Sequence, residues 1–143
     1  MIILADKSHI NSLLEIEYEC FQNDCFKLSK DNFLYHIKKQ NIFVFLCDNV
    51  VAGYILILRY KKSIRIYSIA VKNNYKNMGI GKTLCDYAIE YSKLNLKNKL
   101  YLEVRVSNFS AIKLYEKLGF KFYKKLQNYY CDEDGIKMFL NIF

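Results

Sequence analysis

The stretch "KNMGIGKTL", Lys76 to Leu84, has residue types suited to holding a phosphate group. Glycines at the start of a helix let backbone N–H groups approach an anion closely, and the helix N-terminus adds about half a positive charge. Gly79 and Gly81 occupy such positions, while Lys82 offers a charge and Thr83 a hydroxyl. The residues alone leave two interpretations open: a pyrophosphate site that needs no metal, or a tight turn that glycine makes possible.

Two common nucleotide-binding motifs do not fit this stretch. A triphosphate loop, G-x-x-x-x-G-K-[ST], requires a glycine where Lys76 stands. A dinucleotide fingerprint, G-x-G-x-x-G, requires a glycine where Leu84 stands. No later strand ends in an aspartate that would hold Mg²⁺ for a triphosphate. The glycine stretch therefore predicts neither a nucleotide triphosphatase nor a dinucleotide-dependent enzyme.

The charge of the chain leaves its partner open. The formal net charge is +8, and its 19 lysines and three arginines are spread over the whole sequence rather than packed into one block. A basic surface attracts phosphate-rich ligands, RNA or ribosomal particles. A lysine-rich composition also produces scattered, solvated charge without any partner. Charge alone therefore identifies no ligand.

Length and composition indicate one soluble domain. The 143 residues fit a single domain, 52% of them are hydrophobic, and no linker or repeat divides them. No apolar run approaches the roughly 18 residues of a membrane span, and the N-terminus lacks the basic region of a signal peptide. We expect a cytoplasmic protein without membrane contact. Only His9 and His36 are histidines, and no C-x-x-C pair occurs, which argues against a zinc site.

The elements that must position these residues follow from hydrophobic periodicity. The opening "IILA" reads as a strand, Ser8 is the expected cap of a first helix, and a second helix begins near Ser29. Two apolar strands then form a hairpin joined at Asp48 and Asn49. The segment "IRIYSIAV" is a third strand of this region, and the glycine stretch and a helix follow it.

The second half continues the alternation of strands and helices. "KLYLEVRVS" alternates strictly between apolar and polar residues, and the next helix ends at Gly119. Two strands, 121–126 and 137–142, complete the order β-α-α-β-β-β-α-β-α-β-β. This order predicts a mixed sheet with helices on its faces, an α/β or α+β layered fold.

Three segments resemble the GNAT acyltransferases. "IAVKNNYKNMGIGKTL" is similar to their acetyl-CoA motif. "LEVRVSNFSAIKLYEKLGF" most closely resembles the RimI-type ribosomal-protein alanine N-acetyltransferases, since it has every fixed letter of LEVR-x-SN-x-x-A-x-x-LY-x-x-x-GF. The tail "NYYCDEDGIKM" and the early "IEYECF" are also similar to that group. The resemblance implies one acetyltransferase domain over 1–143, with a mostly antiparallel sheet and helices on both faces.

The sequence departs from the pattern of this group at three places. Lys76 stands where the group has Gln or Arg, and Gly135 where it has Ala. The chain also has no Trp, although the group commonly carries one near the position of Cys25 and Phe26. The missing Trp bears on the acceptor pocket rather than on the cofactor site.

The resemblance implies acetyl-CoA as the cofactor, without a metal. The main chain of Ile69, Ala70 and Val71 would pair with the pantetheine arm, the Val71 N–H would serve as oxyanion donor, and Asn108 would bond the arm. The pyrophosphate would lie on the amides of the glycine stretch, that is Lys76, Asn77, Met78, Gly79, Ile80, Gly81, Lys82 and Thr83.

The resemblance also implies the catalytic pair. Glu103, on the polar face of its strand, is the expected general base, and Tyr115 the expected general acid for the departing thiolate. Their structural alternatives are a surface glutamate paired with Arg105 or a lysine, and a core tyrosine. Asn108 has the alternative of an ordinary capping residue.

Four residues are candidates for the acceptor site, with packing as the equal alternative: Glu17, Phe21, Tyr129 and Tyr130. An acidic side chain on an apolar helix stripe needs a hydrogen-bond partner or a cavity, so Glu17 could line the entrance for the acceptor amine. Tyr129 and Tyr130 would then form the opposite wall of that entrance.

The function implied by the resemblance is acetyl transfer to the N-terminal α-amine of a ribosomal protein. Acetylation of a free small amine and a catalytically silent acyl-CoA-binding module are the alternatives. We expect an acceptor protein as partner, no sequence-specific nucleic acid binding, and a monomer or weak homodimer.

Overall fold

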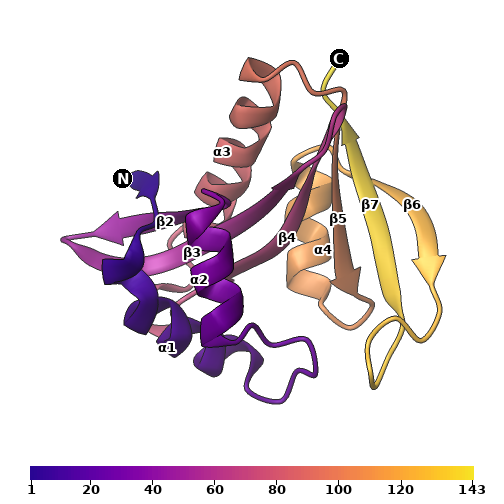
Figure 1. Cartoon of the computed structure of the whole chain (residues 1–143). Helices are drawn as coiled ribbons and strands as arrows, with labels where there is room; N and C mark the ends of the chain where they lie inside the picture. The colour runs from indigo at the N-terminus through magenta and orange to yellow at the C-terminus, as the bar shows by residue number, and fades with distance from the viewer. The chain divides into compact units, whose positions relative to one another are not determined.

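The computed structural model describes residues 1–143 and contains seven strands, four α-helices and two short 3₁₀ helices (Figure 1). Their order matches the predicted β-α-α-β-β-β-α-β-α-β-β. The elements are β1 (Ile2–Leu4), α1 (Ile10–Phe21), α2 (Lys30–Lys38), β2 (Ile42–Cys47), β3 (Val50–Arg59), β4 (Ser63–Val71), α3 (Ile80–Leu94), β5 (Lys99–Arg105), α4 (Phe109–Lys117), β6 (Lys121–Leu126) and β7 (Gly135–Asn141). The 3₁₀ helices cover Lys7–His9 and Asn73–Tyr75.

The strands follow one another in the order β1-β2-β3-β4-β5-β7-β6. The β4–β5 pair is parallel, whereas β1–β2, β2–β3, β5–β7 and β6–β7 are antiparallel. The predicted mixed, mostly antiparallel sheet is therefore confirmed. None of the helices is both long and apolar enough to cross a membrane.

The chain divides into two compact units. The first unit comprises Met1–Ile57 and Ser68–Tyr87, and the second comprises Leu58–Tyr67 and Ala88–Phe143. Strands β3 and β4 and helix α3 each contribute residues to both units. That 1–143 acts as a single domain stays a prediction.

The first unit is built on the β2–β3 hairpin and on the helices α1 and α2, which lie beside each other in Figure 1. The hairpin turns at Asp48 and Asn49, as predicted, with φ of 50° and 65°. Two successive left-handed residues give a turn whose twist matches that of the strands. Its core comes from the apolar middle of β3, where residues 51–57 are all buried.

The helix starts of the first unit show how local chemistry sets the boundaries. Ser29 caps α2, because its hydroxyl accepts from the Asn32 N–H at 3.1 Å while the Asn32 side chain accepts from the Ser29 N–H. Ser8 does not cap α1 directly, so that prediction was wrong. The Asp6 carboxylate accepts from the Ser8 N–H and caps a 3₁₀ turn that runs into α1.

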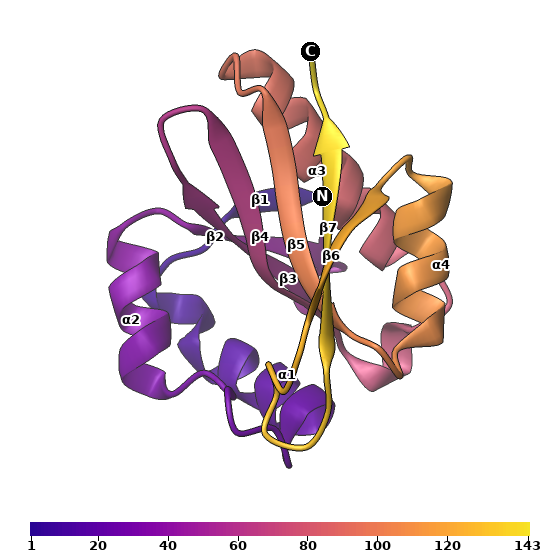
Figure 2. The ribbon, with the colours of Figure 1, turned by 90° about the vertical axis from the view of Figure 1, so that its right-hand side faces the viewer.

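The second unit contains β5, β7 and β6 side by side, together with α4 (Figure 2). The predicted alternation of β5 is confirmed. Leu100, Leu102 and Val104 are buried, whereas Tyr101, Glu103 and Arg105 lie on the opposite face and are only partly covered.

Candidate functional site

The glycine stretch forms an open loop at the start of α3. Gly79 has φ +79°, a left-handed conformation that glycine adopts without strain, and the right-handed helix begins at Ile80. The Gly79 carbonyl accepts from the Thr83 N–H and from the Thr83 hydroxyl, each at 3.0 Å. Ile80, Gly81 and Lys82 lie between these two residues, and their N–H groups have no carbonyl partner within the helix. A left-handed residue followed by right-handed ones aims such groups into an anion-binding concavity.

The space beside Gly79 is open. A Cβ added at Gly79 would meet no atom within 4 Å, and the residues from Lys76 to Gly79 are exposed. Lys82 forms an exposed ion pair with Asp86 at 2.9 Å, so its charge is partly compensated. The loop therefore fits an anion held mainly by backbone amides. The Thr83 hydroxyl already donates its proton to the Gly79 carbonyl of the same turn.

Gly53 is a residue that the sequence analysis missed. A Cβ at this position of β3 would come within 2.8 Å of the Ala70 carbonyl oxygen and within 3.4 Å of the Ile80 and Leu84 side chains. Gly53 thus lets the end of β4 and the first turns of α3 pack closely against β3. An isolated glycine inside an apolar strand is the signal that indicates such an approach.

The end of β4 carries the residues predicted to face the pantetheine arm. Ala70 is buried, whereas Ile69 and Val71 are half-buried. The Val71 carbonyl accepts from the Cys20 thiol at 3.3 Å. Burial raises the pKa of Cys20, so this thiol remains a protonated donor near neutral pH.

Glu17 lies in a buried polar network and also lines an open pocket, together with residues such as Leu14 and Tyr18. Its side chain is 3% exposed. One carboxylate oxygen accepts from the Leu28 N–H at 2.8 Å, and the other accepts from the hydroxyl of fully buried Tyr54. The Tyr54 oxygen lies 2.8 Å from the Ser68 hydroxyl of β4. Glu17 thereby links α1 to two strands, and its predicted acceptor role stays a prediction, as does that of half-buried Phe21.

Burial raises the pKa of Glu17, although the bonds from Leu28 and Tyr54 oppose this shift. A carboxyl with a raised folded-state pKa stabilises the fold most below its unfolded pKa, and this contribution is lost as the pH rises through the folded pKa. We expect Tyr54→Phe to lower the unfolding free energy by roughly 1–3 kcal/mol at pH 7, because a buried carboxylate loses a donor. The loss should shrink at acidic pH.

Thermal melts of Tyr54→Phe at pH 7 and near pH 4.5 would measure this difference. Tyr18→Phe is the matched control, because Tyr18 lies on the same helix as Glu17 but is 60% exposed. Equal melting temperatures for Tyr54→Phe and the wild type at pH 7 would contradict the prediction.

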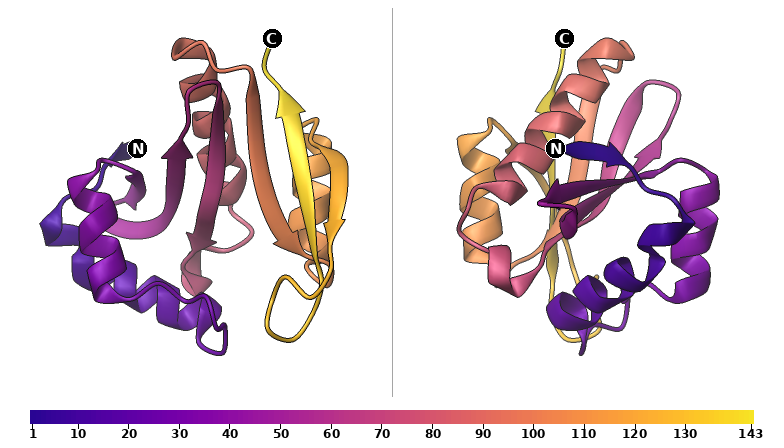
Figure 3. Two further views of the ribbon diagram at one scale, coloured as in Figure 1. Left: turned by 45° about the vertical axis from the view of Figure 1, so that its right-hand side comes forward. Right: turned by 90° about the vertical axis from the view of Figure 1, so that its left-hand side faces the viewer.

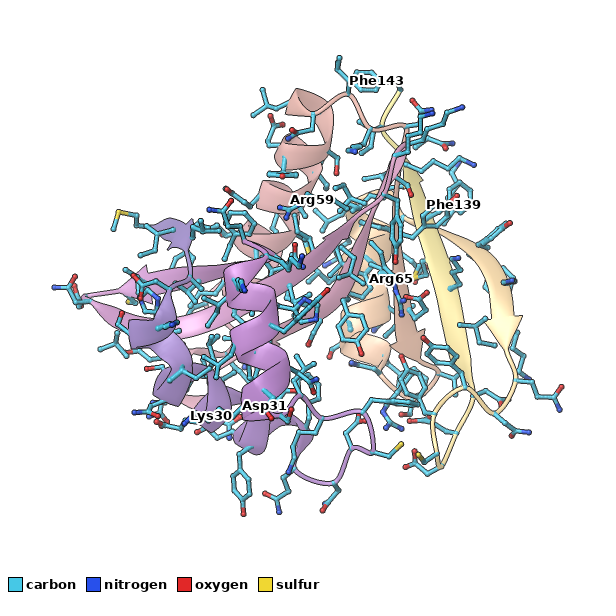
Figure 4. All side chains as sticks on the ribbon, viewed as in Figure 1. Lys30, Asp31, Arg59, Arg65, Phe139 and Phe143 are labelled. Atoms are coloured by element: carbon cyan, nitrogen blue, oxygen red, sulfur yellow. The ribbon has the colours of Figure 1, made fainter.

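In the second unit, Glu103 is held by Arg65. The Arg65 Nε–H donates to Glu103 Oε2 at 2.8 Å, and an Nη2–H of the same guanidinium donates to the Tyr129 hydroxyl at 3.0 Å. The side chains of Arg65 and Glu103 are 25% and 11% exposed. Arg65, labelled in Figure 4, thus joins the expected base to one of the expected acceptor residues.

The structural alternative for Glu103 had named the wrong partner. Arg105 instead donates to Asp132 at 2.6 Å and to Glu133 at 3.1 Å. The parallel register of β4 and β5 pairs Arg65 with Tyr101, which brings Arg65 to the same polar face as Glu103. Arg65 was not among the predicted site residues, although its polar side chain in the alternating strand "IRIYS" indicates a residue on that face.

Tyr129 and Tyr130 pack together in the loop after β6. Their rings are T-shaped with centroids 5.0 Å apart, and the Arg105 guanidinium lies 4.4 Å from the Tyr130 centroid. A Cβ at Gly135 would come within 2.9 Å of the Tyr130 ring and 3.3 Å of the Tyr129 ring. Gly135, one of the three departures from the RimI-type pattern, therefore lets both rings approach β7.

Helix α4 contains the remaining predicted residues. Asn108 caps it, since the Asn108 Oδ1 accepts from the Ala111 N–H at 3.3 Å. The side-chain NH₂ of Asn108 is exposed and donates to no protein group, so a bond to the cofactor arm stays a prediction. Tyr115 is 6% exposed and lies 5.8 Å from the Phe120 ring, between centroids. Its role as an acid also stays a prediction.

The comparisons with known proteins point to one family. Residues 10–120 match the Acetyltransferase (GNAT) family. An N-alpha-acetyltransferase of Saccharolobus solfataricus is 40% identical over 126 residues, which cover 74% of this chain and 73% of that protein. The crystal structure of the Escherichia coli ribosomal-protein-S18-alanine N-acetyltransferase is similar with a TM-score of 0.87 and 28% identity, over 99% of this chain and 93% of that one.

A third similarity shows the fold. An Arabidopsis thaliana protein solved with the bisubstrate analogue CoA-Ac-MVNAL has a TM-score of 0.84 and 21% identity, over 98% of this chain and 97% of that one. Together with the match over residues 10–120, the amide-lined loop before α3 and the mixed sheet place this chain in the GNAT family of acetyltransferases.

Proposed function

We propose that this acetyltransferase moves the acetyl group of acetyl-CoA to the N-terminal α-amine of a ribosomal protein. The observation that supports the cofactor best is the loop at Gly79, where the first amides of a helix have no carbonyl partner within the helix and the space beside Gly79 is open. The acceptor is inferred from the relatives, one named for N-alpha acetylation and one for the alanine of a ribosomal protein.

The chain offers a group for each step of acyl transfer. When bound, acetyl-CoA supplies an activated acetyl thioester, and its pyrophosphate would be held by the amides of Gly79, Ile80, Gly81 and Lys82. Glu103 Oε1 accepts no bond from a protein donor and is the oxygen that would take the proton of the amine. The Val71 N–H would stabilise negative charge on an oxygen, and the Tyr115 hydroxyl would give up a proton.

The acceptor is tested by incubating the protein and acetyl-CoA with peptides that begin with alanine, with N-terminally blocked copies, and with a polyamine and an amino sugar. Mass spectrometry would locate the added acetyl group. We expect modification at the free N-terminal amine and none on the blocked copies. Acetylation of the small amines alone would overturn the proposed acceptor, and no acetylation of any amine would favour a silent acyl-CoA-binding module.

The anion site predicts the behaviour of Gly79→Asn. Asparagine tolerates left-handed φ better than other non-glycine residues, so the loop should keep its path while the side chain fills the empty space. We expect acetyl-CoA to bind roughly tenfold or more weakly, a loss of about 1.4 kcal/mol or more. Calorimetric titration in excess EDTA would measure both the affinity and its independence of metal.

Gly119→Asn is the matched control for that experiment, because Gly119 also has a left-handed φ, +100°, but follows α4 in the second unit. If a folded Gly79→Asn protein bound acetyl-CoA with unchanged affinity, the glycine stretch would be a turn that holds no pyrophosphate.

The hydrogen bond from Arg65 to Glu103 leads to a second prediction, that Arg65 holds the Glu103 carboxylate in position. Without the guanidinium, Glu103 and Tyr129 each lose a donor, and the carboxylate is free to rotate. We expect Arg65→Gln to lower kcat roughly tenfold, since a small misplacement of a reacting group is costly, and to raise the KM of the peptide more than that of acetyl-CoA.

Arg59→Gln is the control for Arg65, because Arg59 is exposed in the same unit and donates to the Tyr91 hydroxyl at 3.4 Å (Figure 4). In a double-mutant cycle, Arg65→Gln should add little to Glu103→Gln, because it acts through that residue. Additive losses in the cycle would mean that Arg65 does not position Glu103.

A further inference from the structure

The net charge of the protein belongs to one unit. The second unit contains 14 Lys and Arg residues against six Asp and Glu residues, whereas the first unit contains eight of each. The lysines that look scattered along the sequence therefore give the second unit all of the net charge of +8. An even scatter of solvated lysines does not account for this asymmetry.

Part of this charge lies on an aromatic face of the sheet. On β5, β7 and β6, which lie side by side in Figure 3, the polar face carries Glu103 and Arg105 and, besides them, Lys99, Tyr101, Lys121, Tyr123, Lys124, Lys137 and Phe139. The last seven are lysines and aromatic residues. We call these seven residues the lysine–aromatic face. The register pairs Tyr101 and Lys121 with Phe139, which is labelled in Figure 4. Tyr123 lies 6.2 Å from Tyr101 and 5.9 Å from Phe139, between ring centroids, and is 53% exposed.

Ammonium groups alternate with these rings. Lys137 lies 4.7 Å from the Tyr101 centroid, Lys99 lies 5.2 Å from that of Phe139, and Lys124 lies 5.8 Å from that of Tyr123. Such cation–π contacts hold long side chains in place over the rings without neutralising their charge.

The one carboxylate on this side of β5, β7 and β6, that of Glu103, is paired with Arg65 and not with a lysine of the lysine–aromatic face. None of its four lysines forms an ion pair, whereas the acids of the second unit that lie nearby in sequence are already paired. Glu103 is bonded to Arg65, Asp132 and Glu133 to Arg105, and Asp134 to Lys125. The face therefore presents uncompensated positive charge together with partly exposed flat rings.

We propose that the lysine–aromatic face binds single-stranded RNA without sequence preference. Single-stranded bases stack on aromatic rings of a sheet while ammonium groups contact the phosphates, so rings and lysines alternating on neighbouring strands suit this ligand. An acidic protein segment would use the lysines but would leave the rings without a partner. The seven residues include none of the groups assigned to acetyl transfer, although Glu103 lies on the same side of the sheet, opposite Lys137. The inference goes beyond the proposed function, and its test leaves Tyr101 and Lys137, the members nearest Glu103, unchanged.

The experiment measures the binding of a labelled oligouridylate of about twelve nucleotides by fluorescence anisotropy over a range of salt concentrations. We expect the affinity to fall as the salt concentration rises. In a plot of the logarithm of the binding constant against the logarithm of the salt concentration, each phosphate contact should contribute about −0.7 to the slope. Lys99→Gln, Lys121→Gln and Lys124→Gln together should reduce that slope by about 2. Tyr123→Ala should weaken binding roughly tenfold through lost stacking.

The matched control replaces Lys30, Lys38 and Lys39 by Gln, which removes the same charge from exposed residues of the first unit and should leave the slope unchanged. Equal loss in the two triple variants, or unchanged binding in the face variant, would overturn the proposal. It would also fail if an acidic peptide bound as tightly as the RNA and were equally sensitive to Tyr123→Ala.

Acetylation of a short peptide, measured in the same variants, separates this inference from the proposed function. We expect the face variants to acetylate the peptide at the wild-type rate. Loss of acetylation alone, with RNA binding unchanged, would place these residues in the transferase reaction and overturn the RNA site.

Discussion

Glu103→Gln should lower kcat by roughly 10²-fold or more at neutral pH, the usual worth of a positioned general base. Glutamine has nearly the same shape, and its amide oxygen still accepts from Arg65, so the local structure should persist while the proton acceptor is lost. Raising the pH should partly restore the rate, because more of the amine then arrives already deprotonated. Measuring kcat against pH for both proteins tests this, with a pre-steady-state burst to show that chemistry is rate-limiting.

Glu116→Gln is the control for this experiment, because Glu116 is an exposed glutamate of α4 in the same unit. If Glu103→Gln kept full activity on every accepted amine, Glu103 would be only the ion-pair partner of Arg65. The base would then have to be Glu17 or a chain of waters, and Glu17 already has both oxygens bonded.

Tyr115→Phe should also lower kcat roughly 10²-fold while leaving acetyl-CoA affinity nearly unchanged, since only a hydroxyl is removed. The ring of Tyr115 packs against Phe120 and is 6% exposed, and phenylalanine preserves that packing. High pH should not rescue this variant, because the missing group donates a proton rather than accepting one. The two catalytic variants therefore separate in their pH–rate profiles, even if their rates at neutral pH are similar.

Tyr91→Phe controls for the removal of a tyrosine hydroxyl at a half-buried position of the same unit. A lower melting temperature with an unchanged kcat in Tyr115→Phe would favour the core-packing interpretation of this residue. Equal loss of kcat in both variants would show that the effect is not specific to the proposed acid.

Local patterns in the sequence were sufficient for the order of the elements and for the turn conformation at Gly79. The strict alternation of β5, the turn at Asp48 and Asn49, and the helix end at Gly119 each depend on backbone geometry within a few residues. The same holds for Gly79, whose position before a helix indicated a special conformation. Such features are encoded where they occur, so they can be read without knowing which strands are neighbours. The cap of the first helical segment, Asp6 instead of Ser8, was missed because two polar residues only two positions apart are both acceptable caps.

Contacts between residues far apart in the chain were decided only by the tertiary structure. Arg65 meets Glu103 across 38 positions, Tyr54 meets Glu17 across 37, and Gly53 is required by the Ala70 carbonyl and the first turns of α3. Each of these contacts depends on strand register and on which helix packs nearby, and the spacing of residues in the sequence specifies neither. The concentration of positive charge in the second unit has the same origin, because segments separated in sequence fold into one unit and bring their lysines together.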